Sequence, residues 1–372
     1  MKSSFKLGRI FGIPLGINYT WFIIFIIVTV SLALYYFPSR FHWSPLAYWI
    51  VGIITSLLFF GSVLAHELAH SLLAVRSGIP VKEITLFIFG GVSQISREAT
   101  RPSTEMALAL VGPLSSVVIA LFFWVIGIAA AGSSEPVAAI AGYLAFINLL
   151  LAAFNMIPGF PLDGGRALRA GLWWARGDYR GATRVASLMG QGVAYLFIAA
   201  GLLIIFLSRD FFTGVWLAII GWFLENAASS SYQEAVLRNA LRGFTVRDLM
   251  NRDYLSVPPS LTLHAMVNDY FLTTIRRYFL VSQGDRLLGL MTLHNVKEVP
   301  RQRWETTTVG EVMTPADKVE VARPQEEAIE TLERMDEENI NQMPVVEGEK
   351  ILGVIARDSL LHFIRTRAEL RR

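Results

Sequence analysis

Six long apolar segments constrain this 372-residue chain more than any other feature of its sequence. A helix needs about 20 mainly apolar residues to cross the roughly 30 Å hydrocarbon core of a bilayer. Segments of that length, or close to it, are found at residues 17–36, 46–75, 106–131, 137–157, 185–207 and 212–228. The sequence therefore predicts a multi-span α-helical membrane protein with six transmembrane helices, the first being a retained anchor rather than a cleaved signal.

Charged residues divide the chain into two regions of different character. Only 17% of all residues are charged, and the mean hydropathy is +0.46. Residues 1–231 carry 14 basic and 9 acidic side chains, whereas residues 232–372 carry 19 and 21. Only the second region is polar enough to fold in water, so we expect a membrane domain at 1–231 followed by soluble domains. Cysteine is absent, which excludes disulfide scaffolds, thiolate metal sites and cysteine nucleophiles.

Basic residues alternate between the two sides of the predicted membrane domain. Three of its loops carry Lys2, Lys6, Arg9, Arg76, Lys82, Arg97, Arg101, Arg166, Arg169, Arg176, Arg180 and Arg184. The opposite loops carry only Arg40 and Arg209. Because lysine and arginine are retained on the cytoplasmic side, we expect a multi-pass protein of the cell membrane with both termini in the cytoplasm. The basic excess is thus explained by topology, and no nucleic-acid partner is expected.

The soluble region contains an internal duplication. The hexapeptide TVRDLM at Thr245 matches TVGEVM at Thr308, and RLLGLMT at Arg286 matches KILGVIA at Lys350. Each repeat predicts the order strand, helix, strand, strand, helix, with first helices at 261–277 and 325–339 and the next strands at 279–282 and 344–347. This pattern resembles an α/β tandem pair of cystathionine-β-synthase (CBS) domains, expected at 244–300 and 301–372.

The second apolar segment contains the sequence His66-Glu67-Leu68-Ala69-His70. On a helix, two histidines four residues apart share one face, as two ligands of a tetrahedral metal require. Glu67 lies about 100° around the helix from His66, where it can act as a general base without being a ligand. Ionisable side chains inside a membrane segment indicate function. The motif therefore predicts a metal site, with zinc favoured by the donor set.

Asp163 is the best candidate for a third ligand. It lies in the sequence NMIPGFPLDGGR at residues 155–166, where two prolines end the fourth apolar segment and two glycines permit a tight turn. Between Glu105 and Asp178 the only other acidic residue is Glu135, which belongs to an opposite loop. The alternative is an aspartate that caps the helix that follows.

Together, the HELAH and NMIPGFPLDGGR motifs resemble the two signature motifs of the site-2 protease family of intramembrane zinc metalloproteases. The resemblance implies that His66, His70 and Asp163 bind one zinc ion and that Glu67 is the catalytic base. It also implies an endopeptidase that cleaves the transmembrane segments of single-span, membrane-anchored proteins in regulated intramembrane proteolysis. A C-terminal CBS pair, in a regulatory role, resembles one prokaryotic subgroup of this family.

A second class of function stays open from the residues alone. In a CBS-regulated metal-ion transporter or channel, the same three side chains would bind a transported or regulatory metal. Transport needs no general base beside the ligands, whereas hydrolysis does, so Glu67 distinguishes the two.

Three further features are candidates for substrate binding. Residues 83–96 are too short to span the bilayer and are interrupted by Gly90 and Gly91, which predicts a small re-entrant β hairpin near the site. Its open edge, with Gly90, Gly91 and Val92, can pair with an extended substrate; the alternative is a cytoplasmic connector. Asn148 and Asn155 lie on one helix face, where they can bind substrate or join helices.

The CBS pair carries an incomplete nucleotide-binding pattern. Nucleotide-binding members of that family place a glycine before a serine or threonine and an aspartate after it. Thr292 and Asn295 in the first repeat, and Asp358 in the second, match this pattern only in part. Adenine-nucleotide binding, homodimer formation through the CBS pair and substrate docking all stay open.

Overall fold

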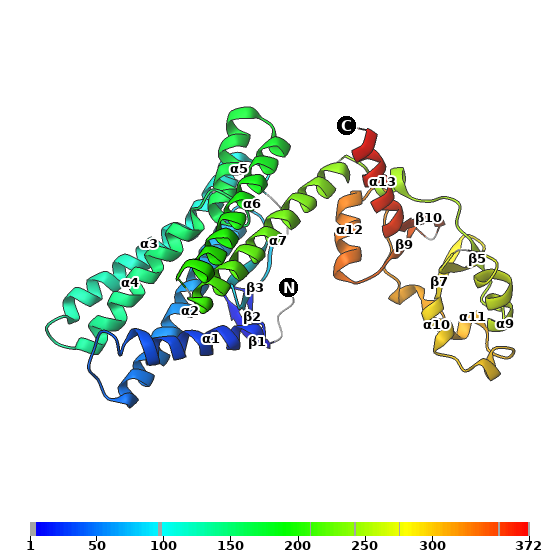
Figure 1. The fold of residues 1–372 in the computed structure, drawn as a ribbon. Helices are drawn as coiled ribbons and strands as arrows, with labels where there is room; N and C mark the ends of the chain where they lie inside the picture. Colours follow the sequence, from blue (N-terminus) through cyan, green and yellow to red (C-terminus); the bar gives the residue numbers. More distant parts are fainter. Residues whose placement is uncertain are drawn as a thin grey trace. The chain divides into compact units, whose positions relative to one another are not determined.

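The computed structural model describes residues 5–95, 99–208, 210–241, 243–274, 276–348 and 350–370. The chain forms two compact units, Met1–Ala235 and Val236–Arg372 (Figure 1). Three of the basic residues used to predict the topology, Lys2, Arg97 and Arg209, lie outside the described residues, as does Ser96 at the end of the predicted hairpin.

Among the described residues, five helices are long and apolar enough to cross a membrane. They are α2 (Pro45–Arg76), α3 (Pro102–Ala130), α4 (Glu135–Asn155), α6 (Tyr179–Leu203, continued by the π-helix η2, Ile204–Ser208) and α7 (Phe211–Leu241). They contain five of the six predicted apolar segments to within a few residues. The prediction of several long apolar helices is confirmed, and these five are candidate membrane spans.

The first apolar segment differs from the prediction. Its helix runs from Thr20 to Tyr36, as α1 (Thr20–Ser31) and the π-helix η1 (Leu32–Tyr36), and it is shorter than the other five. Ile17 is not helical, because it ends a buried strand. An apolar run does not by itself distinguish a buried strand from a helix, so the predicted start at residue 17 was wrong. A sixth crossing by this helix stays a prediction.

A four-stranded sheet packs against α2. Its strands are β1 (Phe5–Ile10), β2 (Ile13–Ile17), β3 (Val81–Phe87) and β4 (Gly90–Ile95), in that spatial order. β2 and β3 are parallel, whereas β1–β2 and β3–β4 are antiparallel hairpins. Ile13, Leu15 and Ile84 pack together with Leu64, Leu68 and Leu72 of α2. β4 is therefore an edge strand of a sheet that is held against the helix with the HELAH motif.

The β3–β4 hairpin occupies the segment predicted at 83–96, with Phe87 opposite Gly90 and Val81 opposite Ile95. Its insertion into the bilayer stays a prediction. The N-terminal hairpin β1–β2 was not predicted.

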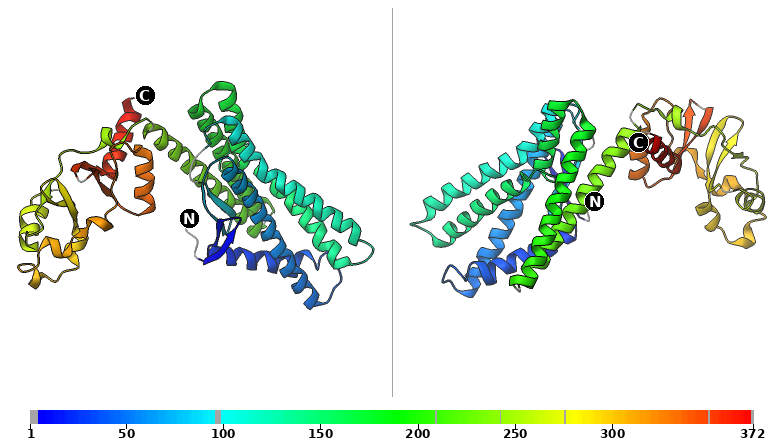
Figure 2. Two further views of the ribbon diagram at one scale, coloured as in Figure 1. Left: turned by 180° about the vertical axis from the view of Figure 1, so that it is seen from behind. Right: turned by 45° about the horizontal axis from the view of Figure 1, so that its top comes forward.

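α3 lies at the centre of the helix packing. It contacts α2, α4 and the shorter helix α5 (Asp163–Arg176), and it runs beside α4 in both views of Figure 2. α5 is amphipathic and ends at Gly177, which has a left-handed backbone conformation (φ 69°). This arrangement places α2, α3 and the first turn of α5 next to one another.

In the second unit, both sequence repeats contribute strands to one sheet. The first repeat contains α8 (Val246–Leu249), β5 (Ser256–Val257), α9 (Leu263–Ala265), η3 (Met266–Phe271), β6 (Tyr278–Gln283), β7 (Arg286–Thr292), α10 (Leu293–Lys297) and η4 (Arg301–Arg303). The second contains α11 (Val309–Val312), β8 (Thr314–Pro315), η5 (Ala316–Lys318), α12 (Ala328–Glu337), β9 (Gln342–Glu347), β10 (Lys350–Ala356) and α13 (Arg357–Leu370). The strand order is β5-β6-β7-β10-β9, with β8 on β7.

The helix predicted at 261–277 ends earlier, at Phe271. Thr273 and Thr274 follow it, and their hydroxyls donate to the carbonyls of Asp269 and Tyr270. Such side-chain bonds compete with continued helical bonding, so the helix does not extend to residue 277.

Each short leading helix packs in the core of the other repeat. Val246 of α8 lies in a cluster with Met335, Val345 and Ile355 of the second repeat. Val309 of α11 lies in the core of the first repeat, and its N–H donates to Leu261 O. The two repeats therefore share their hydrophobic cores and stabilise one another.

Candidate functional site

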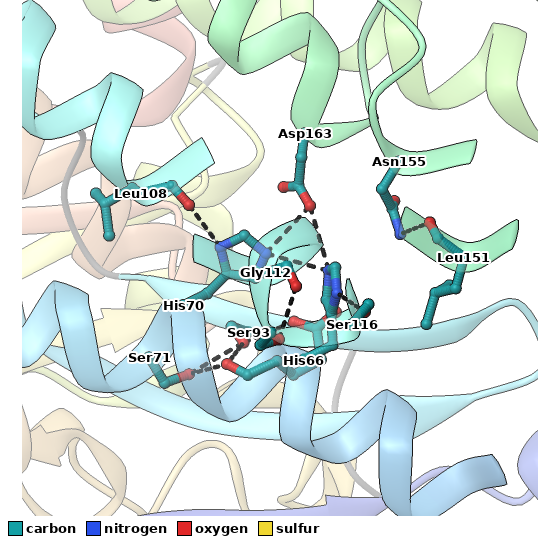
Figure 3. A network of polar contacts seen from close by, with 12 residues as sticks. His66, His70, Ser71, Ser93, Leu108, Gly112, Ser116, Leu151, Asn155 and Asp163 are labelled. Carbon is teal, nitrogen blue, oxygen red and sulfur yellow. Dashed lines mark hydrogen bonds and ion pairs between the residues drawn. The ribbon is translucent and has the colours of Figure 1, made fainter. Parts of the chain in front are cut away.

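The three predicted metal-binding side chains meet at one point (Figure 3). Asp163 Oδ2 lies 3.2 Å from His66 Nε2 and 3.1 Å from His70 Nε2, and the two Nε2 atoms are 3.2 Å apart. Tetrahedral zinc with ligand bonds of about 2.0–2.1 Å requires ligand separations of about 3.3 Å. The donor atoms therefore already have the spacing that zinc demands.

The opposite ring nitrogens of both histidines are hydrogen-bonded. His70 Nδ1 lies 2.7 Å from Leu108 O, and His66 Nδ1 lies 3.0 Å from Ser116 Oγ, both on α3. A carbonyl oxygen only accepts hydrogen bonds, so His70 Nδ1 carries a proton, and in the neutral imidazole the Nε2 lone pair faces the site. Both histidines are 4% exposed. Bonds of this kind orient metal-ligating histidines.

Gly112 of α3 forms the wall of the site beside the imidazoles. A Cβ atom built on Gly112 would contact His70 Nε2 and would lie 2.7 Å from His66 Nε2. The absence of a side chain at this position therefore keeps the space between the two histidines open. Neither Gly112 nor the hydrogen-bonding partners on α3 was identified from sequence.

Asp163 is the first residue of α5, where the helix dipole favours a negative charge. Helix α4 ends at Asn155, and the loop between α4 and α5 includes both prolines of the motif. A Cβ atom on Gly165 would collide with the main chain of Gly159 and Phe160. The two glycines after Asp163 are needed because this loop folds tightly against the start of α5.

A buried ion pair that was not predicted holds this loop in place. Arg169 of α5 pairs with Glu105 of α3, and its Nε donates to Glu105 Oε1 over 2.6 Å. The Arg169 guanidinium carbon also lies 4.9 Å from the ring centroid of Phe160 and 4.8 Å from that of Tyr179. Glu105 is 1% exposed and Arg169 is 6% exposed. In the sequence, the one indication of this pair was an acidic residue, Glu105, placed directly before the third apolar segment.

Glu67 is half-buried beside the edge strand β4. Its Oε2 accepts a hydrogen bond of 2.7 Å from Ser93 Oγ, and its main-chain O accepts one of 2.9 Å from Ser71 Oγ. A Cβ atom on Gly91 would clash with Glu67 Cγ. The predicted substrate residues Gly90, Gly91 and Val92 thus lie on the strand that touches Glu67.

The two asparagines have different environments. Asn148 is fully buried, and its Nδ2 donates to Ser62 Oγ of α2 (3.2 Å) and to Leu144 O (2.8 Å). This geometry fits the interhelical alternative. Asn155 is half-exposed near Asp163, and its Nδ2 donates to Leu151 O over 3.1 Å (Figure 3).

The nucleotide-binding candidates of the first repeat take part in a helix cap. Asn295 Oδ1 accepts from the Thr292 N–H (2.9 Å) and hydroxyl (2.7 Å), which caps α10. Asn295 Nδ2 donates to Val312 O over 3.1 Å, and the side chain is 9% exposed. Asp358 instead lies in the first turn of α13 and lines an open surface pocket with Ser359, His362, Phe363 and Thr366.

Comparisons with known proteins match two family models to this chain. The family model described as Peptidase family M50 matches residues 54–140 and 126–199, and the CBS domain model matches residues 246–301 and 309–366. A Synechocystis protein named a zinc metalloprotease is 35% identical over 99% of this chain and 97% of its own length. Rip3 of Mycobacterium tuberculosis, also named a zinc metalloprotease, is 33% identical over 98% of this chain and 93% of Rip3.

Among solved structures, the site-2 protease from Methanocaldococcus jannaschii is 28% identical, with 61% of this chain and 94% of that chain covered and a TM-score of 0.44. The alignments with the relatives in Synechocystis and Mycobacterium cover nearly the whole length of this chain. The chain therefore belongs to the M50 peptidases, the site-2 protease family of zinc metalloendopeptidases, and carries a tandem CBS pair after its peptidase domain.

Proposed function

We propose that this protein cleaves the transmembrane segments of single-span, membrane-anchored proteins within the bilayer, in regulated intramembrane proteolysis. The observation that carries the proposal is the convergence of Asp163 of α5 with His66 and His70, which lie beside Glu67 on α2, a helix long and apolar enough to span a membrane. A membrane segment does not hold such ionisable groups without a function.

In this proposal, His66, His70 and Asp163 hold one zinc ion per chain, and Glu67 is the general base. Zinc, when bound, would supply Lewis acidity, which activates water and polarises the substrate carbonyl. Glu67 accepts the proton of the attacking water and returns it to the departing amide nitrogen. Leu108 O and Ser116 Oγ keep the imidazoles oriented throughout, because they bind the ring nitrogens that do not face the site.

We further propose that substrate docks as an added strand on β4. A transmembrane helix shields its own amides, so it must be extended before it can be cleaved, and pairing with a sheet edge holds it extended. β4 supports this role because it is an edge strand that includes Gly90, Gly91 and Val92. Asn155, close to Asp163, donates to the substrate main chain in this arrangement.

The substitution Ile95→Pro tests whether substrate pairs with β4. It is expected to raise KM or abolish cleavage while zinc content stays unchanged, because proline lacks the N–H that a sheet edge uses. Proline at Ser93 is a weaker test, since it also removes the hydroxyl that binds Glu67. Unchanged turnover in Ile95→Pro would contradict strand addition.

For the rest of the chain we propose six crossings with both termini and the CBS pair in the cytoplasm. The CBS pair regulates the protease, either by binding an adenine nucleotide or by forming a homodimer. Isothermal titration of the full-length protein with ATP and with AMP decides the first role, and absence of binding at millimolar ligand would exclude it. Light scattering of the detergent-solubilised protein decides the second.

The central experiment compares wild type with Glu67→Gln. Both are expected to hold about one zinc per chain, because Glu67 is not a ligand, and only wild type is expected to cleave a panel of single-span membrane proteins. Cleavage that survives in Glu67→Gln would refute the assignment of the base. Zinc binding with no cleavage by wild type, even of single-span proteins from its native membrane, would refute the proposed substrate class.

A further inference from the structure

We propose that Ser93 of β4 is a positioning residue for Glu67, so that the strand on which substrate docks also orients the catalytic base. The inference rests on the proposed function of Glu67 and deepens it. Ser93 Oγ lies 2.7 Å from Glu67 Oε2 and 3.2 Å from Glu67 O. Among the described residues, Ser93 makes the one hydrogen bond to the Glu67 carboxylate.

The register of the sheet places Ser93 on the correct face. Ser93 pairs with Ile84 of β3, and Gly91 pairs with Leu86. Ile84 and Leu86 both pack with residues of α2. Side chains two apart on a strand share a face, so position 91 and position 93 both face α2. At position 91 the strand has no side chain and approaches Glu67 closely, and at position 93 it offers a hydroxyl.

The contacts of Ser71 leave the Ser93 proton available for Glu67. Ser71 Oγ lies 2.9 Å from Glu67 O, one turn back on α2, and 3.1 Å from Ser93 Oγ (Figure 3). Whether the single Ser71 proton is donated to the carbonyl or to Ser93, the Ser93 proton stays available for the Glu67 carboxylate. Hydrogen bonds to an ionised group are about twice as strong as neutral ones, so this bond selects one orientation of a flexible glutamate.

The consequence is a link between β4 and the base. Glu67 has three side-chain torsions, and no other described side chain donates a hydrogen bond to its carboxylate. Loss of the Ser93 hydroxyl would let the carboxylate sample unproductive positions, and a displacement of about 1 Å can cost about 100-fold in rate. The main chain of β4 would be unchanged, so substrate binding would not be affected.

The test compares Ser93→Ala, Ser93→Thr and a control, Ser56→Ala. Ser56 is a fully buried serine on the same helix as Glu67, and it accepts a hydrogen bond from Thr29 of α1 rather than contacting the site. We expect Ser93→Ala to keep full zinc content and lower kcat by about tenfold or more, with KM changed less than about twofold. Ser93→Thr restores the hydroxyl and is expected to recover most of kcat.

Two results would overturn the inference: a kcat for Ser93→Ala within about twofold of wild type, or a loss confined to KM. Wild type and Glu67→Gln run in the same assay separate this failure from failure of the proposed function. If wild type does not cleave, a cysteine pair decides the geometry independently, because the chain has no cysteine of its own. Ser71→Cys with Ser93→Cys should form a disulfide under mild oxidation, because the two hydroxyl oxygens they replace are 3.1 Å apart, whereas Ser56→Cys with Ser93→Cys should not. Absence of the first disulfide would overturn the placement of Ser93 against this part of α2.

Discussion

Replacing Gly112 by alanine is expected to weaken zinc binding without unfolding the protein. The new methyl carbon would lie 2.7 Å from His66 Nε2 and from His70 Cε1, about 0.7 Å closer than the 3.4 Å at which ordinary contact begins. Metal–ligand distances tolerate changes of only about 0.2 Å. Both imidazoles must therefore leave the positions in which their Nε2 atoms face Asp163.

The size of the effect follows from the displaced ligands. Loss of a single outer-shell contact weakens metal affinity by about 10–100-fold. Gly112→Ala disturbs two of the three ligands themselves, so we expect at least 100-fold weaker zinc binding, equal to about 2.8 kcal/mol. Alanine is also favoured over glycine inside a helix by about 0.5–1 kcal/mol, so α3 itself should not be destabilised.

The matched control is Gly127→Ala, which makes the same change on the same helix. A Cβ atom there would meet Ala141 Cβ at 3.6 Å, an ordinary contact. Zinc affinity is measured by competition with a chelator of known affinity, and zinc content by mass spectrometry, with wild type beside both variants. Zinc affinity of Gly112→Ala within about threefold of wild type would refute the argument that this glycine holds the space between the histidines.

Three further perturbations have defined outcomes. Arg169→Met should lower the free energy of unfolding by about 3–5 kcal/mol, because the Glu105 carboxylate stays buried without the Arg169 guanidinium. The double variant Arg169→Met with Glu105→Leu should recover much of that free energy. Prolonged dialysis against a strong chelator should abolish cleavage, and stoichiometric zinc should restore it. The Thr245 N–H and hydroxyl lower the pKa of Asp248, so Asp248 stabilises the fold above its unfolded pKa of 3.8 and this contribution is lost as pH falls. The difference in unfolding temperature between wild type and Asp248→Asn should therefore shrink from pH 7 towards pH 3, and a constant difference would contradict the capping argument.

Much of the membrane unit was predictable because its signals are local. Each long apolar segment specifies its own helix, since a helix in a membrane satisfies all its backbone hydrogen bonds internally. Ile17 shows the limit of that reasoning. It belongs to an apolar run but lies in β2, because pairing with β1 and with β3, about 70 residues further along the chain, satisfies its backbone instead.

The same distinction applies to the candidate site. His66 and His70 face one way because four residues make about one helical turn, a relation within a single segment. Asp163 was a candidate by elimination, and only the tertiary structure places it 3.2 Å from His66, at a separation of 97 residues.

The roles of Gly112 and Ser93 carried no local signal, and for the Arg169–Glu105 pair the sequence showed only an acidic residue beside an apolar segment. A missing side chain matters only where another helix packs against it, and a serine becomes a positioning residue only when a strand is held beside the base. The sequence by itself determined the helices, the repeat and the chemistry of the ligands, because these depend on spacing along the chain. The tertiary structure decided which residues shape the site and orient its groups. Those roles arise from contacts between distant segments, and the spacing of two segments along the chain does not specify their distance in space.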